Sequence, residues 1–475
     1  MQMHVDPDLN EKLKKSGILK SQKIAFLCSN SMEYVKLLTQ IIFLEGVVVP
    51  VSPVMPVYKI HTILKNIGCS KIIVGEDTDY KDDASIKSIS FKYFSEELRK
   101  INFKKIANGF DICKYAGNSE RNASIFLTSG STDIPKAVLH SFANHWYSAI
   151  GSNANILFKT GDCWVVALPL NHVSGFSAVF KALAGQADVY VKPLGIDLLE
   201  SLKSDNSHTH ISLIPAQLSE LIADPSGVVI LKKFKAILIG GSSAPNKLME
   251  ETKSLGLNAY NSYGSTEMSS QITCTVQNDS LEHLKTSGKL LKYREIKISG
   301  ESEILVKGKT LFGGYVKHSS SKSPEIHKNV DEEGWFSTND LGFMDEEGYL
   351  HVYGRKDLMF VSNGENIFPE EIENALKEMK EIDDAVIVPV DGSKNDQKPA
   401  AFLKTKNNLR LDYLTLRKRL IKKIEYFKIP EVFFDWPNDI EKTSLKPDRE
   451  SYRKRANDLI SSNIKNNQSD KSNVF

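Results

Sequence analysis

The sequence predicts an α/β protein with two unequal parts. We expect a large N-terminal domain of layered α/β subdomains plus a β-rich subdomain, followed by a small mobile α+β C-terminal domain. Length is the first observation, because 475 residues favour two or more domains. The second is that short apolar runs alternate with helix-like stretches, which is typical of buried, mostly parallel strands. The third is a change near residue 301, after which the pattern favours short antiparallel strands joined by charged turns.

The expected elements follow this alternation from the N-terminal end of the chain. Residues 23–27 read as a strand, and residues 31–44 read as a helix with Ser31 at its N-cap. Further strands are expected at 47–51, 71–74, 123–127, 164–168, 189–191, 210–214, 236–239, 303–308, 348–354 and 385–389. Further helices are expected at 58–67, 176–183, 370–379 and 413–424.

Changes of composition predict the domain boundaries. Residues 1–354 are expected to form the large domain and residues 358–460 the small domain, with the boundary at residues 355–357, where the family resemblance described below implies a hinge. The last stretch, residues 461–475, is rich in Asn, Ser and Lys and nearly free of apolar residues. Such a segment cannot bury enough apolar surface to order itself, so we expect a disordered tail.

Composition and charge argue against several classes of protein. A net charge of +2 gives no global field for nucleic acid or an anionic membrane. The five cysteines are scattered without a C-x-x-C pair, which argues against a disulfide framework or zinc site and favours a reducing, cytoplasmic compartment. The most apolar region, residues 37–57, contains three prolines and Glu45, so membrane insertion is not expected. The expected partners are small molecules, and a homodimer is left open.

The loop at residues 128–137 has the composition of a phosphate-binding segment. It is rich in Ser, Thr and Gly, includes Lys136, and follows the apolar strand at 123–127. Hydroxyls, free backbone N–H groups and one ammonium suit a bound polyphosphate. It is not a Walker-type loop, because no second Gly precedes the lysine. Taken alone, such a segment is more often an ordinary Ser/Gly turn.

Two later segments place polar groups after predicted strands. Residues 240–245 form a glycine turn directly after the strand at 236–239, where α/β sheets usually bind ligands. Residues 263–267 bring a Tyr, a hydroxyl and a carboxylate onto one short loop, and Glu267 offers oxygen ligands suited to Mg²⁺. The plain alternatives are a Gly-rich βα turn and a surface turn.

Further polar segments lie near the predicted boundary and the C-terminal end. Asp340 stands between apolar neighbours close to aromatic residues, and it is a candidate for bonding a ribose diol. Residues 353–357 and 363–373 flank the boundary, and Lys446 lies beside a Ser/Thr turn. An Asx turn at Asp340 and an ordinary solvated charge at Lys446 are the alternatives.

The order of these segments resembles that of the adenylate-forming superfamily of acyl-CoA synthetases, luciferases and non-ribosomal peptide adenylation domains. The resemblance extends from about Lys23 to Arg449. It implies two half-reactions. A carboxylate attacks the α-phosphate of ATP to give an acyl-adenylate and pyrophosphate, and the thiol of coenzyme A then displaces AMP. The implied co-substrates are a small carboxylic acid, ATP and coenzyme A, with Mg²⁺ as the metal.

The resemblance also implies a role for individual residues. The implied catalytic residues are Lys446, which bridges the substrate carboxylate and the α-phosphate, Thr266, which contacts the α-phosphate, and Glu267, which holds Mg²⁺. The implied ATP contacts are Thr128, Ser129, Gly130, Ser131, Thr132 and Lys136 for the β- and γ-phosphates, Gly241, Ser242, Ser243, Ala244, Pro245 and Tyr263 for adenine, and Asp340 and Arg355 for ribose. Asp357 is the implied hinge, and Gly364, Glu365 and Asn366 form the implied loop that faces coenzyme A.

Three residues depart from the family pattern at positions where glycine is common: Asp133, Asn339 and Leu445. Asp tolerates positive φ better than most residues, so the phosphate loop can keep its conformation. A carboxylate at Asp133 is expected to weaken ATP binding unless it points outward or pairs with a base. The charged site residues are retained, which favours a working enzyme.

Four segments resemble the o-succinylbenzoate–CoA ligases of menaquinone biosynthesis most: residues 142–152, 168–177, 210–218 and 262–271. A polar pocket wall for an aromatic keto-diacid is expected from His172, Ser174, Gly175, Ser177 and Ser269. A long-chain fatty acid would instead prefer an apolar tunnel. A buried His172 bonded to backbone is the competing interpretation. Two other functions stay open, a medium-chain fatty or aryl acid–CoA ligase and a catalytically weak binding or regulatory paralogue.

Overall fold

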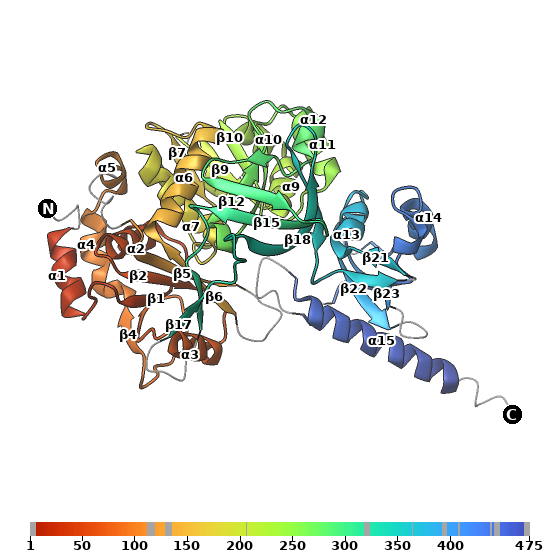
Figure 1. Ribbon diagram of the computed structural model, residues 1–475, viewed down its shortest axis with the longest axis horizontal. Helices are drawn as coiled ribbons and strands as arrows, with labels where there is room; N and C mark the ends of the chain where they lie inside the picture. The colour runs from red at the N-terminus through yellow and green to blue at the C-terminus, as the bar shows by residue number, and fades with distance from the viewer. Residues whose placement is uncertain are drawn as a thin grey trace.

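The computed structural model describes residues 6–111, 119–128, 135–205, 207–317, 324–362, 364–391, 397–406, 409–437, 439–440 and 447–469, with side chains up to residue 461 in the last segment. Figure 1 shows a large body built from most of the chain and a smaller group of elements from the C-terminal part beside it. The predicted fold class is confirmed: the described residues form five sheets in a mixed α/β arrangement.

The first large sheet has eight strands in the order β17-β16-β6-β5-β2-β1-β3-β4. Their bounds are β1 Lys23–Leu27, β2 Val47–Val51, β3 Lys71–Val74, β4 Lys87–Ser90, β5 Asn122–Thr128, β6 Lys136–Ser141, β16 Gly314–Lys317 and β17 Glu325–His327. Strands β1 to β5 pair in parallel, whereas β6, β16 and β17 extend the sheet with antiparallel pairs. The strands predicted at 23–27, 47–51 and 71–74 coincide with β1, β2 and β3.

The second large sheet has seven strands in the order β13-β12-β11-β10-β9-β7-β8. Their bounds are β7 Cys163–Val166, β8 Asp188–Val191, β9 His210–Leu213, β10 Ala236–Ile239, β11 Ala259–Ser265, β12 Ser270–Cys274 and β13 Lys289–Leu290. Strands β8, β7, β9, β10 and β11 are parallel neighbours, so their carboxyl ends share one edge.

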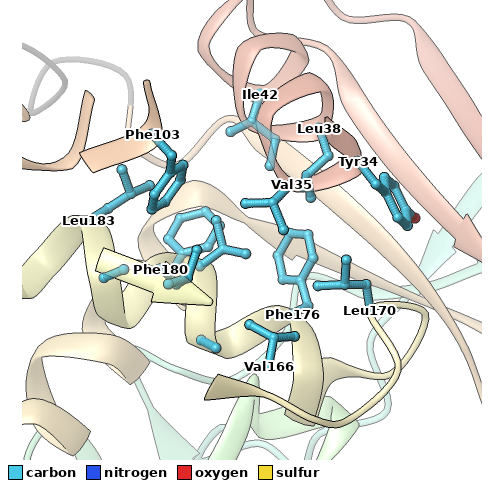
Figure 2. Packing of buried hydrophobic residues seen from close by; sticks show 14 of the residues in the cluster. Tyr34, Val35, Leu38, Ile42, Phe103, Val166, Leu170, Phe176, Phe180 and Leu183 are labelled. Atoms are coloured by element: carbon cyan, nitrogen blue, oxygen red, sulfur yellow. The ribbon is translucent and has the colours of Figure 1, made fainter. Parts of the chain in front are cut away.

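Helices α2 (Met32–Phe43), α6 (Phe142–Ile156) and α7 (Val173–Gly185) contribute to the apolar core that joins the two sheets. Figure 2 shows Val35, Leu38 and Ile42 of α2 facing Phe176 and Phe180 of α7. The same core includes Phe126 of the first sheet and Trp164 of the second. Nearly every residue of α7 from Val173 to Leu183 is buried, as expected for a helix covered on both sides.

The remaining elements of the large body are a four-stranded antiparallel sheet and shorter helices. The sheet has the order β14-β15-β18-β19, with bounds Arg294–Ile298, Glu303–Gly308, Phe336–Met344 and Leu350–Arg355. The helices are α1 Pro7–Lys15, α3 Val57–Asn66, α4 Ser95–Lys100, α5 Phe103–Asn108, α8 Leu198–Lys203, α9 Pro215–Ala223, α10 Pro225–Leu231, α11 Asn246–Ser254 and α12 Leu281–Leu284. This sheet is the β-rich part that the change near residue 301 predicted.

The C-terminal group contains two small sheets and three helices (Figure 1). Its strands are β20 Phe360–Ser362, β21 Glu365–Ile367, β22 Ile382–Asp391, β23 Gln397–Thr405 and β24 Val432–Asp435. Its helices are α13 Pro369–Lys377, α14 Tyr413–Leu420 and α15 Arg449–Ser469. The domain boundaries stay a prediction, although β19 ends at Arg355, where the hinge was expected to begin.

Two local features bear on the expectations from the sequence. The Ser31 side chain accepts a hydrogen bond from the backbone N–H of Tyr34 and caps α2, as predicted. Helix α15 runs to Ser469, and the disordered tail expected at residues 461–475 stays a prediction. The helix starts against the small-domain core through Tyr452 and Ala456. Among the described residues, no helix is long and apolar enough to span a membrane.

Candidate active site

The Thr266–Glu267 pair lies in a tight turn between β11 and β12. A 3₁₀ turn spans Thr266–Met268, and Ser269 and Ser270 follow with φ angles of 55° and 112°, which L residues rarely adopt. Gly264 is required here because a Cβ at this position would lie 2.1 Å from the carbonyl oxygen of Ser270. The reversal therefore holds two adjacent predicted catalytic residues in a strained, closely packed turn.

Two strands of the first sheet hold this turn in place. His140 on β6 lies with Nε2 2.7 Å from the carbonyl oxygen of Thr266, and the hydroxyl of Tyr315 on β16 donates to Oε1 of Glu267 at 2.8 Å. The backbone N–H of Phe312 donates to the carbonyl of Glu267 at 2.8 Å. Burial and the nearby Glu267 carboxylate raise the pKa of Tyr315 above its usual value, so the phenol stays protonated and donates. The turn is thus fixed by one backbone N–H and by two side chains, His140 and Tyr315, that no local sequence pattern indicated.

The predicted phosphate loop is anchored beside this turn. Thr128 ends β5 and Lys136 begins β6, and the two residues are direct partners across the strand pair. Ser129, Gly130, Ser131, Thr132 and Asp133 lie outside the described residues. The ammonium of Lys136 lies 5.4 Å from the ring centroid of Tyr315, and the Tyr315 hydroxyl in turn contacts Glu267. The base of the predicted phosphate loop and the predicted Mg²⁺ ligand therefore meet at one aromatic ring.

The predicted ribose contacts form a charged cluster at the end of the four-stranded sheet. The hydroxyl of Tyr263 donates to Oδ2 of Asp340 at 2.5 Å, and Arg355 lies 3.7 Å from Oδ1 of the same carboxylate. Arg355 also donates twice to the predicted hinge residue Asp357, at 2.8 Å each. These bonds lower the pKa of Asp357 and raise the pKa of Arg355, so the pair stays charged. Tyr263, predicted for adenine, is thus joined to the ribose side.

Asn339 shows how the chain tolerates one of its departures from the family pattern. Its φ is 60°, the left-handed conformation that Gly adopts freely and that Asn tolerates better than most residues. Its carbonyl accepts the backbone N–H of Lys356 at 2.7 Å, which ties β18 to the segment after β19. The departure therefore preserves the backbone beside Asp340. Asp133 and Leu445 lie outside the described residues.

The predicted adenine turn follows β10 at the shared edge of the second sheet. Gly241 has φ 85°, and a Cβ at Gly240 would lie 2.8 Å from Oγ of Ser262, so the chain passes close to β11 here. Because β10 and β11 are parallel neighbours with Ile239 opposite Asn261, residues 241–245 leave the sheet at the level where β11 continues to Tyr263. Ser243 accepts a hydrogen bond from the side-chain amide of Asn374 on α13 at 2.9 Å, which joins this turn to the small domain.

The predicted substrate residues are divided between α7 and the turn after Glu267. His172 is the N-cap of α7, and Gly175 packs so closely that a Cβ would lie 2.3 Å from the carbonyl oxygen of Pro169. Ser177 donates to the carbonyl of Ser174 at 2.9 Å, and the buried Ser269 donates to the carbonyl of Thr310 at 2.9 Å. Both hydroxyls bond to backbone in this structure, and the role of this set in substrate binding stays a prediction.

The remaining predicted residues belong to the small domain. Glu365 and Asn366 begin β21, which pairs with β20, and both are exposed together with Gly364. Lys446 lies outside the described residues, so its role stays a prediction. No group of three or more His, Cys, Asp or Glu side chains within the described segments could hold a metal ion. A single carboxylate such as Glu267 fits Mg²⁺ only where phosphate oxygens and water complete the octahedron, the usual arrangement at nucleotide sites.

The comparisons with known proteins agree with this arrangement. The sequence pattern of the family described as AMP-binding enzyme matches residues 10–316. The chain belongs to the AMP-binding enzyme family. The predicted enzyme class, an AMP-forming acid–CoA ligase, is confirmed with the family. The matched residues include the predicted phosphate loop, the adenine turn and the Thr266–Glu267 turn, whereas the ribose cluster and the small domain follow them.

Relatives extend the similarity over the rest of the chain. A 2-succinylbenzoate–CoA ligase of Oceanobacillus iheyensis is 30% identical over 84% of this chain and 82% of its own length. The o-succinylbenzoate CoA synthetase of Bacillus subtilis in complex with the acyl-adenylate intermediate OSB-AMP has a TM-score of 0.80 at 27% identity, covering 94% of this chain and 90% of that one. The same enzyme in complex with ATP and magnesium ion has a TM-score of 0.75 at 27% identity, covering 90% and 88%.

Proposed function

We propose that this protein activates o-succinylbenzoate with ATP and transfers the acyl group to coenzyme A. The observation that carries the proposal is the agreement in fold and sequence, over nearly the whole chain, with an enzyme whose structure contains the acyl-adenylate of this acid. The described contacts support the proposal: Lys136, at the base of the predicted phosphate loop, lies beside the Tyr315 ring, the Tyr315 hydroxyl bonds Glu267, and Tyr263 bonds Asp340. The proposal places the reaction in the cytoplasm, where ATP and coenzyme A are available.

In the first half-reaction, an anion must approach a polyanion, so neutralisation of charge dominates the barrier. In this proposal the Thr266 hydroxyl donates a hydrogen bond to the α-phosphate, and the Lys446 ammonium bridges the attacking carboxylate and the same phosphate. Asp340 accepts the ribose hydroxyls. Mg²⁺ on Glu267 supplies positive charge to the phosphate oxygens. Lys136 at the base of the phosphate loop adds an ammonium beside the β- and γ-phosphates.

In the second half-reaction, the small domain is proposed to reorient about Asp357 so that residues 364–366 face the thiol. Two contacts seen in the structure would change in such a movement. Asn374 on α13 bonds Ser243 of the adenine turn, and Arg355 bonds Asp357 itself. The hinge residue is therefore tied directly to a predicted ribose contact, which gives nucleotide binding a physical connection to domain orientation.

The test is ATP–pyrophosphate exchange with a panel of acids, followed by detection of the CoA thioester. We expect exchange with o-succinylbenzoate and weak or no exchange with benzoate and with straight-chain acids of six to ten carbons. Exchange with the fatty acids alone would contradict the assigned substrate. Exchange with none of the acids would contradict the proposal that the protein is an acid-activating enzyme. Lys446→Ala is expected to abolish exchange while the melting temperature changes little, because the lysine acts on substrate.

A further inference from the structure

One buried imidazole contacts the predicted α-phosphate residue without being part of the site assigned so far. His140 lies on β6, where alternate residues share a face, so it follows Lys136 and Val138 along one side of the strand. Its side chain is fully buried, with its ring 5.8 Å from that of Phe126 and 4.9 Å from that of His145. Strand β6 therefore connects the base of the phosphate loop at one end with the Thr266 turn at the other.

The hydrogen bond to Thr266 fixes the tautomer of this imidazole. A carbonyl oxygen only accepts, so Nε2 of His140 must carry the hydrogen at 2.7 Å from the Thr266 oxygen. Burial lowers the pKa of His140 to about 4, which leaves Nδ1 without a proton near neutral pH. Within the described residues Nδ1 has no hydrogen-bond partner. The ring therefore directs its one N–H at the Thr266 carbonyl.

Packing alone does not explain a histidine at this position. A leucine would fill similar volume without burying an unpaired acceptor, which costs free energy because the buried nitrogen loses its hydrogen bond to water. The neighbouring His145 offers a direct contrast, because it is equally buried but its Nε2 is 2.7 Å from Oγ of Ser124 instead of the turn. The two imidazoles share the same core and differ in whether they contact the predicted catalytic turn.

We infer that His140 is a positioning residue for adenylate formation, acting through the Thr266 carbonyl on the contact to the α-phosphate. The inference rests on the proposed function. Thr266 uses its carbonyl twice, for the N–H of Ser269 inside the turn at 3.0 Å and for His140 outside it. The second bond joins the turn to the first sheet. Small displacements of a group that stabilises developing charge cost much of its effect, because the geometry must be set before the reaction.

The test compares His140→Leu, His140→Gln and His145→Leu by the single-turnover rate constant of pyrophosphate release. This rate constant does not depend on the fraction of protein that is folded, so a loss of stability alone does not move it. We expect His140→Leu to slow the step about tenfold and His140→Gln, whose amide can donate from a similar reach, to stay within about threefold of wild type. His145→Leu is expected to lower the melting temperature as much as His140→Leu while keeping the rate constant within about twofold.

A double-mutant cycle adds a second readout. In a Thr266→Ala background, His140→Leu should slow the step by less than about twofold, because the group it positions has been removed. Equal rate constants for His140→Leu and His145→Leu, or failure of His140→Gln to restore the rate, would overturn the inference. Full additivity with Thr266→Ala would overturn it as well. A wild-type enzyme that activates no acid would instead refute the proposed function, so the two failures are distinct.

Discussion

The Thr266–Glu267 turn and the Asp340–Arg355–Asp357 cluster hold the predicted nucleotide contacts in opposite ways. Around the turn, the donors are neutral and largely buried: an imidazole N–H, a phenol and a backbone N–H. In the cluster, the Arg355 guanidinium pairs with the carboxylates of Asp340 and Asp357. The Arg355 and Asp357 side chains remain 34% and 44% exposed. The first arrangement is fixed before a ligand binds, whereas the second can exchange partners.

This difference matches the demands of the two half-reactions. The α-phosphate must be held in one geometry when charge develops on it, which favours a preorganised turn. In the proposed second half-reaction, the predicted ribose side must tolerate movement of the small domain. An exposed ion pair contributes little stability, so this pair can be broken at low cost. The four predictions below test this contrast, in order of decreasing effect.

The largest effect is expected from removing the charge of Glu267. Glu267→Gln keeps an oxygen that can accept the Tyr315 hydroxyl but loses the negative charge that suits Mg²⁺. We expect the rate of adenylate formation to fall about 100-fold or more, with a higher Mg²⁺ requirement. The measurement is a Mg²⁺ titration of pyrophosphate exchange. An unchanged Mg²⁺ dependence would mean that the carboxylate does not hold the metal.

Breaking the ion pair at the predicted hinge should separate the two half-reactions. Asp357→Asn removes the bidentate partner of Arg355, which can then turn towards Asp340 at 3.7 Å. We expect CoA thioester formation to slow about tenfold while pyrophosphate exchange changes by less than about threefold. Glu301→Gln is the matched control, because Glu301 pairs with the neighbouring Lys356 on the surface. Equal losses in both half-reactions would contradict a hinge role for this pair.

Local sequence patterns predicted much of the fold. An apolar run between polar flanks predicted the bounds of β1. A Ser followed by an amphipathic stretch predicted the N-cap of α2. The predicted site residues could also be recognised locally, because a hydroxyl, Gly or carboxylate on a loop can be identified from a few neighbouring residues of the sequence. His140 and Tyr315 were missed because each acts on a partner far along the chain, at separations of 126 and 48 residues.

The hydroxyls of Ser177 and Ser269 show the converse problem. Their residue type suggested a polar pocket wall, but a hydroxyl in a helix or a tight turn finds a backbone carbonyl nearby. Whether a hydroxyl faces a ligand or its own backbone depends on rotamer and packing, which the sequence does not contain. The Gly-Gly-Tyr at 313–315, where β16 begins, is a local signal that could have pointed to Tyr315.

A smaller effect on rate is expected from the phenol that holds Glu267. Tyr315→Phe removes one hydrogen bond while the ring that lies beside Lys136 remains. We expect adenylate formation to slow about threefold to tenfold, through a looser Glu267. Tyr349→Phe is a close control, because Tyr349 is also buried and donates to the Asp279 carboxylate at 2.8 Å, away from the turn. Similar rates for both variants would show that the bond to Glu267 serves stability alone.

The smallest effect concerns stability against acid. Burial lowers the pKa of His140 to about 4 from an ordinary value near 6.5. At pH values between about 4 and 6.5, this imidazole is therefore protonated in the unfolded chain and neutral in the folded chain. Stability should therefore fall as pH falls from about 6.5 to 4, with no contribution from this group above pH 7. His140→Gln should lose less stability than wild type over this window, by roughly 1–2 kcal/mol.

The measurement is the urea midpoint of wild type, His140→Gln and His327→Gln at several pH values. His327 is exposed at the end of β17, so His327→Gln serves as the control that removes an imidazole from the surface instead of from the core. The ribose cluster contributes in the same direction at lower pH, because Arg355 lowers the pKa of Asp357 and the stability from this pair is lost when acid protonates that carboxylate. If His140→Gln followed wild type through the whole window, the imidazole would be protonated in the fold, and the neutral character assigned to the phosphate side would be wrong.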